Sequence, residues 1–173
     1  MSNEKPSHQE LEERILKLEK DLLKYKSLET EYLRSEKKLS SFTAHVPCII
    51  YLCLNNPTFD MVFLNDYVEK LTGYPKEEFL SRRMSFVDLY HAEDRSRIIQ
   101  EVETPLSQGK TFKLKYRIWH KNGSLRWVEE EGTMAYIDDQ AYLEGFIIDI
   151  TDRIHFEETL QQRESYLTSI IEN

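Results

Sequence analysis

The feature that most constrains the fold is an N-terminal stretch without helix-breaking residues. Neither Gly nor Pro occurs between Ser7 and Pro47. Within this stretch, apolar side chains recur in alternating steps of four and three residues, which is the heptad spacing of a coiled coil. The residues that set this stripe are Leu11, Ile15, Leu18, Leu22 and Tyr25. The pattern predicts an amphipathic coiled-coil helix over residues 10–41, preceded by a polar, disordered tail over residues 1–9.

The register of the stripe changes after Tyr25. Strict continuation would place Glu29 and Glu36 in the seam, whereas a three-residue shift places mostly apolar side chains there. These are Leu28, Tyr32, Leu39 and Phe42. Such a shift is a stammer, which overwinds a coiled coil locally. A helix this long and polar has little of its own chain to bury against, so we expect it to pair with a second copy; packing on its own domain is the alternative.

Residues 42–153 combine strand and helix patterns. Pro47 ends the first helix, and apolar runs or alternations then predict five strands. These strands cover residues 48–54, 61–65, 111–119, 125–137 and 143–150. Asn122 and Gly123 mark a hairpin turn, a helix is predicted over 93–108, and shorter helices follow the second strand. The predicted fold class is α+β, a five-stranded antiparallel sheet with helices on one face.

The last segment, residues 154–173, predicts a C-terminal linker helix. Its heptad positions carry Phe156, Leu160, Leu167 and Ile170. Residues 28–42 and 156–170 also match one another at an offset of 128 positions, which indicates a repeat boundary. We therefore expect this helix to lead toward a further domain of the same chain.

Composition argues against several classes of function. The net charge of −8 disfavours nucleic-acid binding, which needs clustered Lys and Arg. Cys48 and Cys53 cannot supply half of a zinc site at their spacing, and no metal site is predicted. No apolar run approaches the roughly 20 residues of a membrane-spanning helix, and the N-terminus lacks the apolar region of a signal peptide. We expect a cytoplasmic protein without a membrane segment in this stretch.

Four motifs in this order are familiar as a set. They are NDYVEKLTGYPKEEFL (65–80), YHAEDR (90–95), YRIWHKNGSLRWVEEEG (116–132) and LEGFIIDITDR (143–153). With them, the stretch from Phe42 to Arg153 resembles a PAS domain, the sensor module of bacterial and archaeal signalling proteins. The resemblance implies a five-stranded antiparallel sheet, coiled-coil linkers and an output domain elsewhere in the chain, typically a histidine kinase. It implies no catalysis by this segment itself.

The resemblance also bears on cofactors. Haem-binding members use a His on the long helix, and residues 93–108 contain none; His91 lies just before it, where a capping role is expected. Light-sensing members need a reactive Cys where this chain has Ser81, Arg82, Arg83 and Met84. We therefore predict neither haem nor flavin.

A small organic ligand between the sheet and the long helix is a further implication. The candidate lining residues are Tyr51, Phe63, Ile98, Val102, Leu114, Tyr116 and Phe146. The alternative is that these side chains fill the space themselves, as cores normally do. A buried Tyr116 would need a partner for its hydroxyl.

Two acidic motifs remain. Glu129, Glu130 and Glu131 are interpreted as part of a solvated sheet face, with Glu130 opposite to its neighbours. The second motif runs through Asp149, Thr151 and Asp152 and is expected to relay a signal into the last helix, because Asp and Thr side chains bond backbone groups at such junctions. Thr151 or Asp152 is expected to cap that helix.

These observations predict a sensory module that forms a homodimer and relays a signal to a downstream domain. Two alternatives stay open. The first is an interaction module that binds nothing small, and the second is a sensor with an unidentified small-molecule ligand. An enzyme is disfavoured because no nucleophile–base pair, metal cluster or phosphate loop can be assembled from the motifs.

Overall fold

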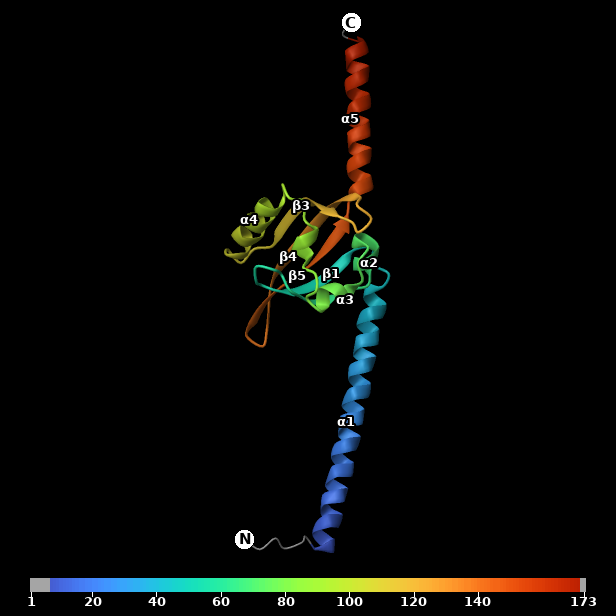
Figure 1. Ribbon diagram of the computed structural model, residues 1–173, viewed down its shortest axis with the longest axis vertical. Coiled ribbons are helices and arrows are strands. Elements are labelled where there is room, and N and C mark those ends of the chain that lie inside the picture. Colours follow the sequence, from blue (N-terminus) through green and yellow to red (C-terminus); the bar gives the residue numbers. More distant parts are fainter. Residues whose placement is uncertain (1–6, 172–173) are drawn as a thin grey trace. The chain divides into compact units, whose positions relative to one another are not determined.

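The structure of the protein, a computed structural model, describes residues 7–171. Most of the predicted disordered tail, residues 1–6, lies outside the described residues, as does the side chain of Leu39, which was predicted for the seam. The chain divides into two compact units, Met1–Phe42 and Thr43–Asn173. In Figure 1 the first corresponds to the long blue helix, and the second begins where that helix ends.

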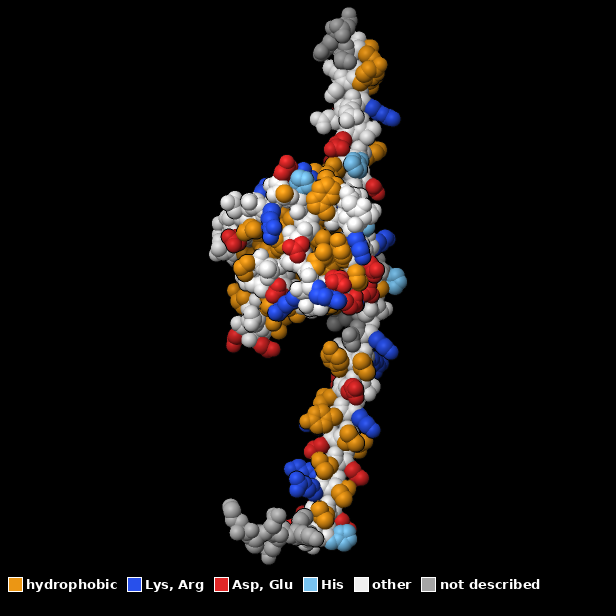
Figure 2. Space-filling model, viewed as in Figure 1, with side chains coloured by type: hydrophobic (Ala, Val, Ile, Leu, Met, Phe, Trp, Pro, Cys, Tyr) orange, Lys and Arg blue, Asp and Glu red, His pale blue; other side chains and the backbone are white. Residues whose placement is uncertain are grey.

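The described part of the first unit is helix α1 (His8–Thr43), which is 36 residues long and whose last residue already belongs to the second unit. It starts two residues earlier than predicted because Ser7 and Glu10 form a capping box. The Ser7 N–H donates to Glu10 Oε2 at 2.7 Å, and the Glu10 N–H donates to Ser7 Oγ at 3.3 Å. The predicted stripe is exposed along the helix, from 44% at Leu11 to 71% at Tyr25, and Figure 2 shows apolar side chains recurring down its length.

The second unit contains a five-stranded, fully antiparallel sheet in the order β2-β1-β5-β4-β3. The strands are β1 (Ile49–Leu54), β2 (Met61–Leu64), β3 (Phe112–Trp119), β4 (Leu125–Ile137) and β5 (Gln140–Asp149). This confirms the predicted α+β class and sheet. Strand β5 starts three residues earlier than expected, because Asp138 and Asp139 both adopt positive φ (49° and 61°) and close a two-residue hairpin.

Short helices cover the sheet on its inner face. They are α2 (Tyr67–Thr72), α3 (Lys76–Leu80), the 3₁₀ turn η1 (Phe86–Leu89) and α4 (Arg95–Leu106). Each contributes buried apolar side chains to one core with the inward residues of the strands, Ile98 and Val102 of α4 among them. Helix α4 packs mainly on β3, at the left of the view in Figure 1.

The chain ends in α5 (Thr151–Ile171), which begins three residues before the predicted linker helix. Its first turn follows β5 without a connecting loop, so the last strand runs directly into the helix. Among the described residues, no helix is long and apolar enough to cross a membrane.

Candidate functional site

The inner face of the sheet holds most of the predicted pocket residues. Tyr51, Leu114 and Tyr116 project from β1 and β3, and Ile98 and Val102 face them from α4; none is more than 4% exposed. These five belong to one hydrophobic cluster. The structure therefore brings together the part of the predicted set that lies between the sheet and the long helix.

Phe63 and Phe146 do not join that cluster, which corrects the predicted set. Phe63 pairs with Leu52 and Phe146 pairs with Ile50, and all four lie on the outer face, because neighbouring strand residues point to opposite sides. Phe146 is 36% exposed. The inward residue is its neighbour Ile147, which is 1% exposed.

The core also contains a carboxylate that the sequence interpretation assigned to solvent. Glu130 projects inward from the middle of β4 and is only 7% exposed. The Tyr51 hydroxyl donates to its Oε1 and the Tyr116 hydroxyl donates to its Oε2, both at 2.6 Å. Glu129 and Glu131 do lie on the outer face, as predicted, so the interpretation was wrong for Glu130 alone.

A usable signal for this site was present in the sequence. Val128, Glu130 and Gly132 share one face of an alternating strand, and a buried carboxylate requires donors. The expectation that Tyr116 needs a hydroxyl partner pointed to the same place. What was missing is the cross-strand register, which pairs Leu114 with Glu130 and so sets Tyr116 beside the carboxylate.

Two glycines make room for the Tyr51 hydroxyl. Gly132 and Gly145 are cross-strand partners on the inner face. A Cβ on Gly132 would lie 2.7 Å from the Tyr51 hydroxyl and 2.5 Å from Cζ of Phe112, and a Cβ on Gly145 would lie 2.8 Å from the same hydroxyl. The absence of both side chains therefore lets Tyr51 reach across β5 to Glu130.

Burial dominates the electrostatics of this cluster. It raises the pKa of Glu130 above its ordinary value, although the hydrogen bonds from Tyr116 and Tyr51 act to lower it. Burial, together with the nearby carboxylate, raises the pKa of Tyr51, Tyr116 and the adjacent Tyr90 well above 10.0. The phenols are thus hydrogen-bond donors at neutral pH. Among the described residues, none of the ion pairs includes Glu130.

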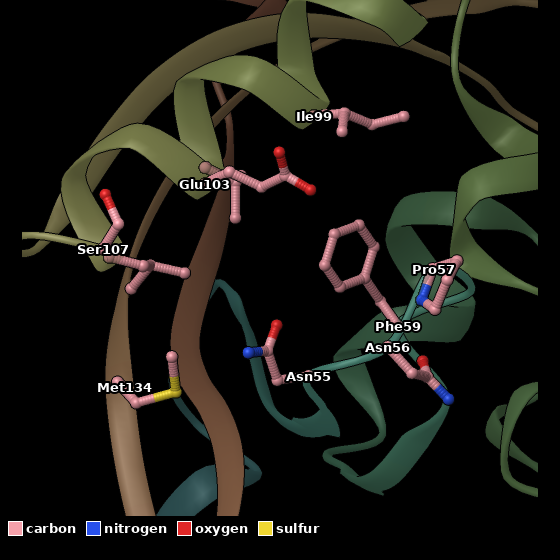
Figure 3. Close-up of a pocket in the computed structure, with 10 residues that line it drawn as sticks. Asn55, Asn56, Pro57, Phe59, Ile99, Glu103, Ser107 and Met134 are labelled. Carbon is pink, nitrogen blue, oxygen red and sulfur yellow. The ribbon is translucent and has the colours of Figure 1, made fainter.

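A small cavity lined by Glu130 neighbours a larger cavity that the carboxylate does not line. The inner one, of about 20 Å³, lies among Tyr51, Tyr90, Phe112 and Glu130. The outer one, of about 470 Å³, lies between α4, the β1–β2 loop and β4 (Figure 3). Phe59 and Val102 line both; the full outer set is Asn55, Asn56, Pro57, Phe59, Ile99, Val102, Glu103, Leu106, Ser107 and Met134.

The predicted relay residues meet at the start of α5. Asp149 Oδ1 accepts the Thr151 N–H at 2.9 Å and its hydroxyl at 2.5 Å, while Asp149 Oδ2 accepts from Arg126 at 2.9 Å. The Thr151 hydroxyl oxygen accepts the Trp127 N–H of β4 at 3.0 Å. Asp149 therefore accepts the first backbone donor of the helix from just before its start. Thr151 and Asp152 are the first two residues of α5, which corrects the expectation that one of them caps it, and Asp152 is exposed.

No group of three or more metal-ligating side chains occurs in the described part of the chain. The inner site presents one buried acceptor group, two phenol donors and an apolar surround.

Comparisons with known proteins agree with this geometry. The family described as the PAS fold matches residues 61–147, about half of the chain. The chain is 28% identical over 148 residues to the methyl sulfide methyltransferase-associated sensor of Methanosarcina acetivorans, covering 83% of this chain and 14% of that protein. It is 36% identical over 67 residues to a blue-light-activated histidine kinase of Brucella anthropi, covering 39% of this chain and 13% of the kinase.

Among solved structures, a sensory box histidine kinase/response regulator from Burkholderia thailandensis superimposes with a TM-score of 0.58 at 22% identity, covering 73% of this chain and 95% of that one. This likeness bears on the fold. The chain spans about a seventh of the length of the two sequence relatives.

Proposed function

The chain belongs to the PAS family, and on that basis we propose that it is the sensory module of a longer signalling protein, which pairs with a second copy and relays the state of its core to an output domain. The observation that carries this proposal is that the buried carboxylate and the helix junction share two neighbouring strands. Glu130 pairs with Ile147, and the next pair on the same face is Val128 with Asp149, two residues before Glu130 in β4 and two residues after Ile147 in β5.

The relay rests on contacts rather than on proximity alone. The Trp127 backbone makes two bonds with the junction: its carbonyl accepts the Ile150 N–H at 2.9 Å, and its N–H donates to the Thr151 hydroxyl oxygen at 3.0 Å. A shift of β4 at Glu130 is therefore transmitted to the first turn of α5. A ligand can bias this state only by binding the two arrangements with different affinity.

Hydrogen–deuterium exchange on the 173-residue chain tests the relay. Glu130→Gln changes the charge of the core without changing its shape, and Glu131→Gln is the matched change on the outer face. We expect Glu130→Gln to alter amide exchange over residues 149–155, and Glu131→Gln to leave it unchanged. Equal exchange in all three proteins would contradict coupling between the core and α5.

Pairing rests on the exposed stripe of α1. A single helix with its apolar side chains in water gains stability by burying them against another copy. Sedimentation at tens of micromolar should show a dimer. Leu18→Asn with Leu22→Asn should shift it toward monomer, whereas Leu16→Asn with Leu23→Asn, equally apolar but outside the stripe, should not. A monomeric wild-type chain would refute pairing.

The remaining parts of the proposal follow from the family and the fold. The module itself is non-catalytic, works in the cytoplasm and depends on a downstream domain, for which a histidine kinase is the first candidate because one relative carries that name. Native mass spectrometry of the chain purified from its own host tests the sensory role. A bound small molecule supports sensing, whereas protein without added mass favours the interaction module.

A further inference from the structure

Among the described residues, Glu130 differs from the other buried or half-buried acidic groups because no ion pair links its carboxylate to a cation. Asp94, which is also 7% exposed, is held by the Arg117 guanidinium at 2.9 Å, and Asp149 is held by Arg126 at 2.9 Å. Glu130 has two neutral phenol donors instead. An ionised carboxylate offers about four acceptor positions, so two phenols leave part of its capacity unused. A buried charge without a partner is costly, and a cation supplied from outside would compensate it.

Space for such a group lies beside the carboxylate. The inner cavity of about 20 Å³ is the size of one water molecule or one ammonium group. It is too small for a whole organic ligand. The outer cavity of about 470 Å³ is large enough for one, and Ile99, Leu106 and Met134 give it an apolar lining.

Phe59 lies, together with Val102, where the two spaces meet. Its ring lines both cavities, and Figure 3 shows it reaching from the β1–β2 loop into the space beneath α4. Its backbone has φ of 47°, which is unfavourable for a bulky residue. The turn around Asn56 holds it there, since Asn56 O accepts the Phe59 N–H at 3.0 Å and Asn56 Oδ1 accepts the Asp60 N–H at 3.1 Å. Rotation of this one side chain would join the cavities.

The charge of the surroundings selects the class of ligand. Among the described residues that line the two cavities, none is Lys, Arg or His, and two are glutamates. Glu103 directs its carboxylate into the outer cavity (Figure 3), and Glu130 closes the inner one. This arrangement repels anions and favours cations.

We infer that the domain binds a small organic cation, with a primary ammonium group at Glu130 between the Tyr51 and Tyr116 hydroxyls and an apolar body in the outer cavity past Phe59. The inference rests on the proposed sensory function and names the chemical class of its ligand. The ammonium donates to the acceptor positions of Glu130 that the phenols leave open. The size of the inner cavity excludes a bulkier, fully methylated head group.

Calorimetric titration of the 173-residue chain tests this assignment. The probes are butylammonium, benzylammonium and 2-phenylethylammonium, with 2-phenylethanol and 3-phenylpropanoate as a neutral and an anionic analogue. We expect at least one ammonium probe to bind about tenfold or more tightly than the alcohol, and the carboxylate not to bind. Equal binding of alcohol and ammonium, or no heat with any ammonium probe at millimolar concentration, would overturn the inference.

Variants locate the site. Glu130→Gln should weaken ammonium binding by about tenfold or more while keeping the folded circular dichroism spectrum, and Glu131→Gln on the outer face should bind as the wild type does. Phe59→Ala should speed association. Unchanged affinity in Glu130→Gln would place the probe elsewhere and refute the site.

The outcome is separable from that of the proposed function. A neutral or anionic molecule found by native mass spectrometry would uphold sensing and overturn the cation assignment. Failure of the exchange coupling between Glu130 and α5, with ammonium binding intact, would uphold the site and overturn the relay.

Discussion

The two faces of strand β4 give three consecutive glutamates different environments. On the outer face, Glu129 lies 3.3 Å from Lys113 Nζ and 3.1 Å from Arg153 Nη2, and Glu131 lies 3.5 Å from Lys113 Nζ. On the inner face, the hydrogen bonds that Glu130 accepts from described side chains come from the Tyr51 and Tyr116 phenols. All three side chains are glutamates, and the alternation of side chains along the strand decides which environment each one has.

The pKa directions follow this difference. Burial raises the pKa of Glu130. At Glu129, partial burial acts in the same sense, but hydrogen bonds from Arg153 and Lys113 outweigh it and lower the pKa. The carboxylates of the outer face are held by cations, whereas Glu130 is the carboxylate for which we propose a ligand.

The largest effect is expected where the inner site is filled. Gly132→Ala would place a methyl group against the Phe112 ring and the Tyr51 hydroxyl, displacing the donor from Glu130. We expect a loss of about 3 kcal/mol in unfolding free energy, the upper range for overpacking, measured by urea denaturation. Thr133→Ala on the outer face is the control, and equal effects of the two changes would remove the role given to Gly132.

A smaller loss is expected at a carboxylate that has its cation. Asp94 is bonded by Arg117 through Nε at 2.9 Å and Nη2 at 3.0 Å, and these bonds first of all lower its pKa from 3.8 to about 2. Asp94→Asn should cost about 2 kcal/mol near neutral pH, as for hydrogen bonds to charged groups. Because the folded pKa is lowered, this stability is present above 3.8 and is lost as pH falls toward 2. A pH-independent deficit would contradict the ion pair.

At Glu130, stability is expected to depend on pH in the opposite direction from Asp94. Its folded pKa is raised above 4.5, so the wild type loses stability as pH rises through that pKa, while the neutral Glu130→Gln does not. The titratable groups facing it, Tyr51 and Cys53 on β1, Tyr116 on β3 and Tyr90 before α4, stay protonated there, since burial raises their pKa values too. Thermal melts across pH should therefore show that the melting temperature of Glu130→Gln rises relative to that of the wild type as pH increases. A constant difference would mean that Glu130 does not titrate in this window.

The smallest effect is expected on the outer face. Glu129→Gln removes ion pairs to Lys113 and Arg153, which are 60% and 48% exposed. Pairs with exposed partners contribute roughly 0–1 kcal/mol, and salt screens them further. Denaturation at low and high ionic strength should show a small difference in unfolding free energy between the wild type and Glu129→Gln, and this difference should decrease as salt is added. A loss as large as that of Gly132→Ala would contradict the division between the faces.

Much of the fold was predictable because its signals are local. Alternation in β3 and the Asn122-Gly123 turn define a hairpin without reference to the rest of the chain. Strand β5 was less predictable, because Phe146, Ile147 and Ile148 form a continuous apolar run in which alternation does not tell inward from outward. The inward assignment of Phe146 failed for that reason.

The candidate site depended on information that no single segment carries. From the sequence alone, Glu130 is interpreted as one of three solvated glutamates. Only the strand register shows that Tyr116 and Tyr51 lie against it. The start of α5 shows the same limitation: Asp149, Thr151 and Asp152 all carry side chains that can cap a helix. Only the bond from the Thr151 N–H to Asp149 Oδ1 shows which of them accepts a backbone donor of the first turn.

Carbon-13 NMR titration of the glutamate carboxylates measures the central contrast directly. Glu130→Gln and Glu129→Gln spectra assign the two resonances in the 173-residue chain. The account predicts that Glu130 titrates above its ordinary value of 4.5 and Glu129 below it, and that an ammonium probe lowers the midpoint of Glu130 alone. A Glu130 carboxylate with the same titration midpoint as Glu129, or with a midpoint that the ammonium probe does not change, would contradict the account.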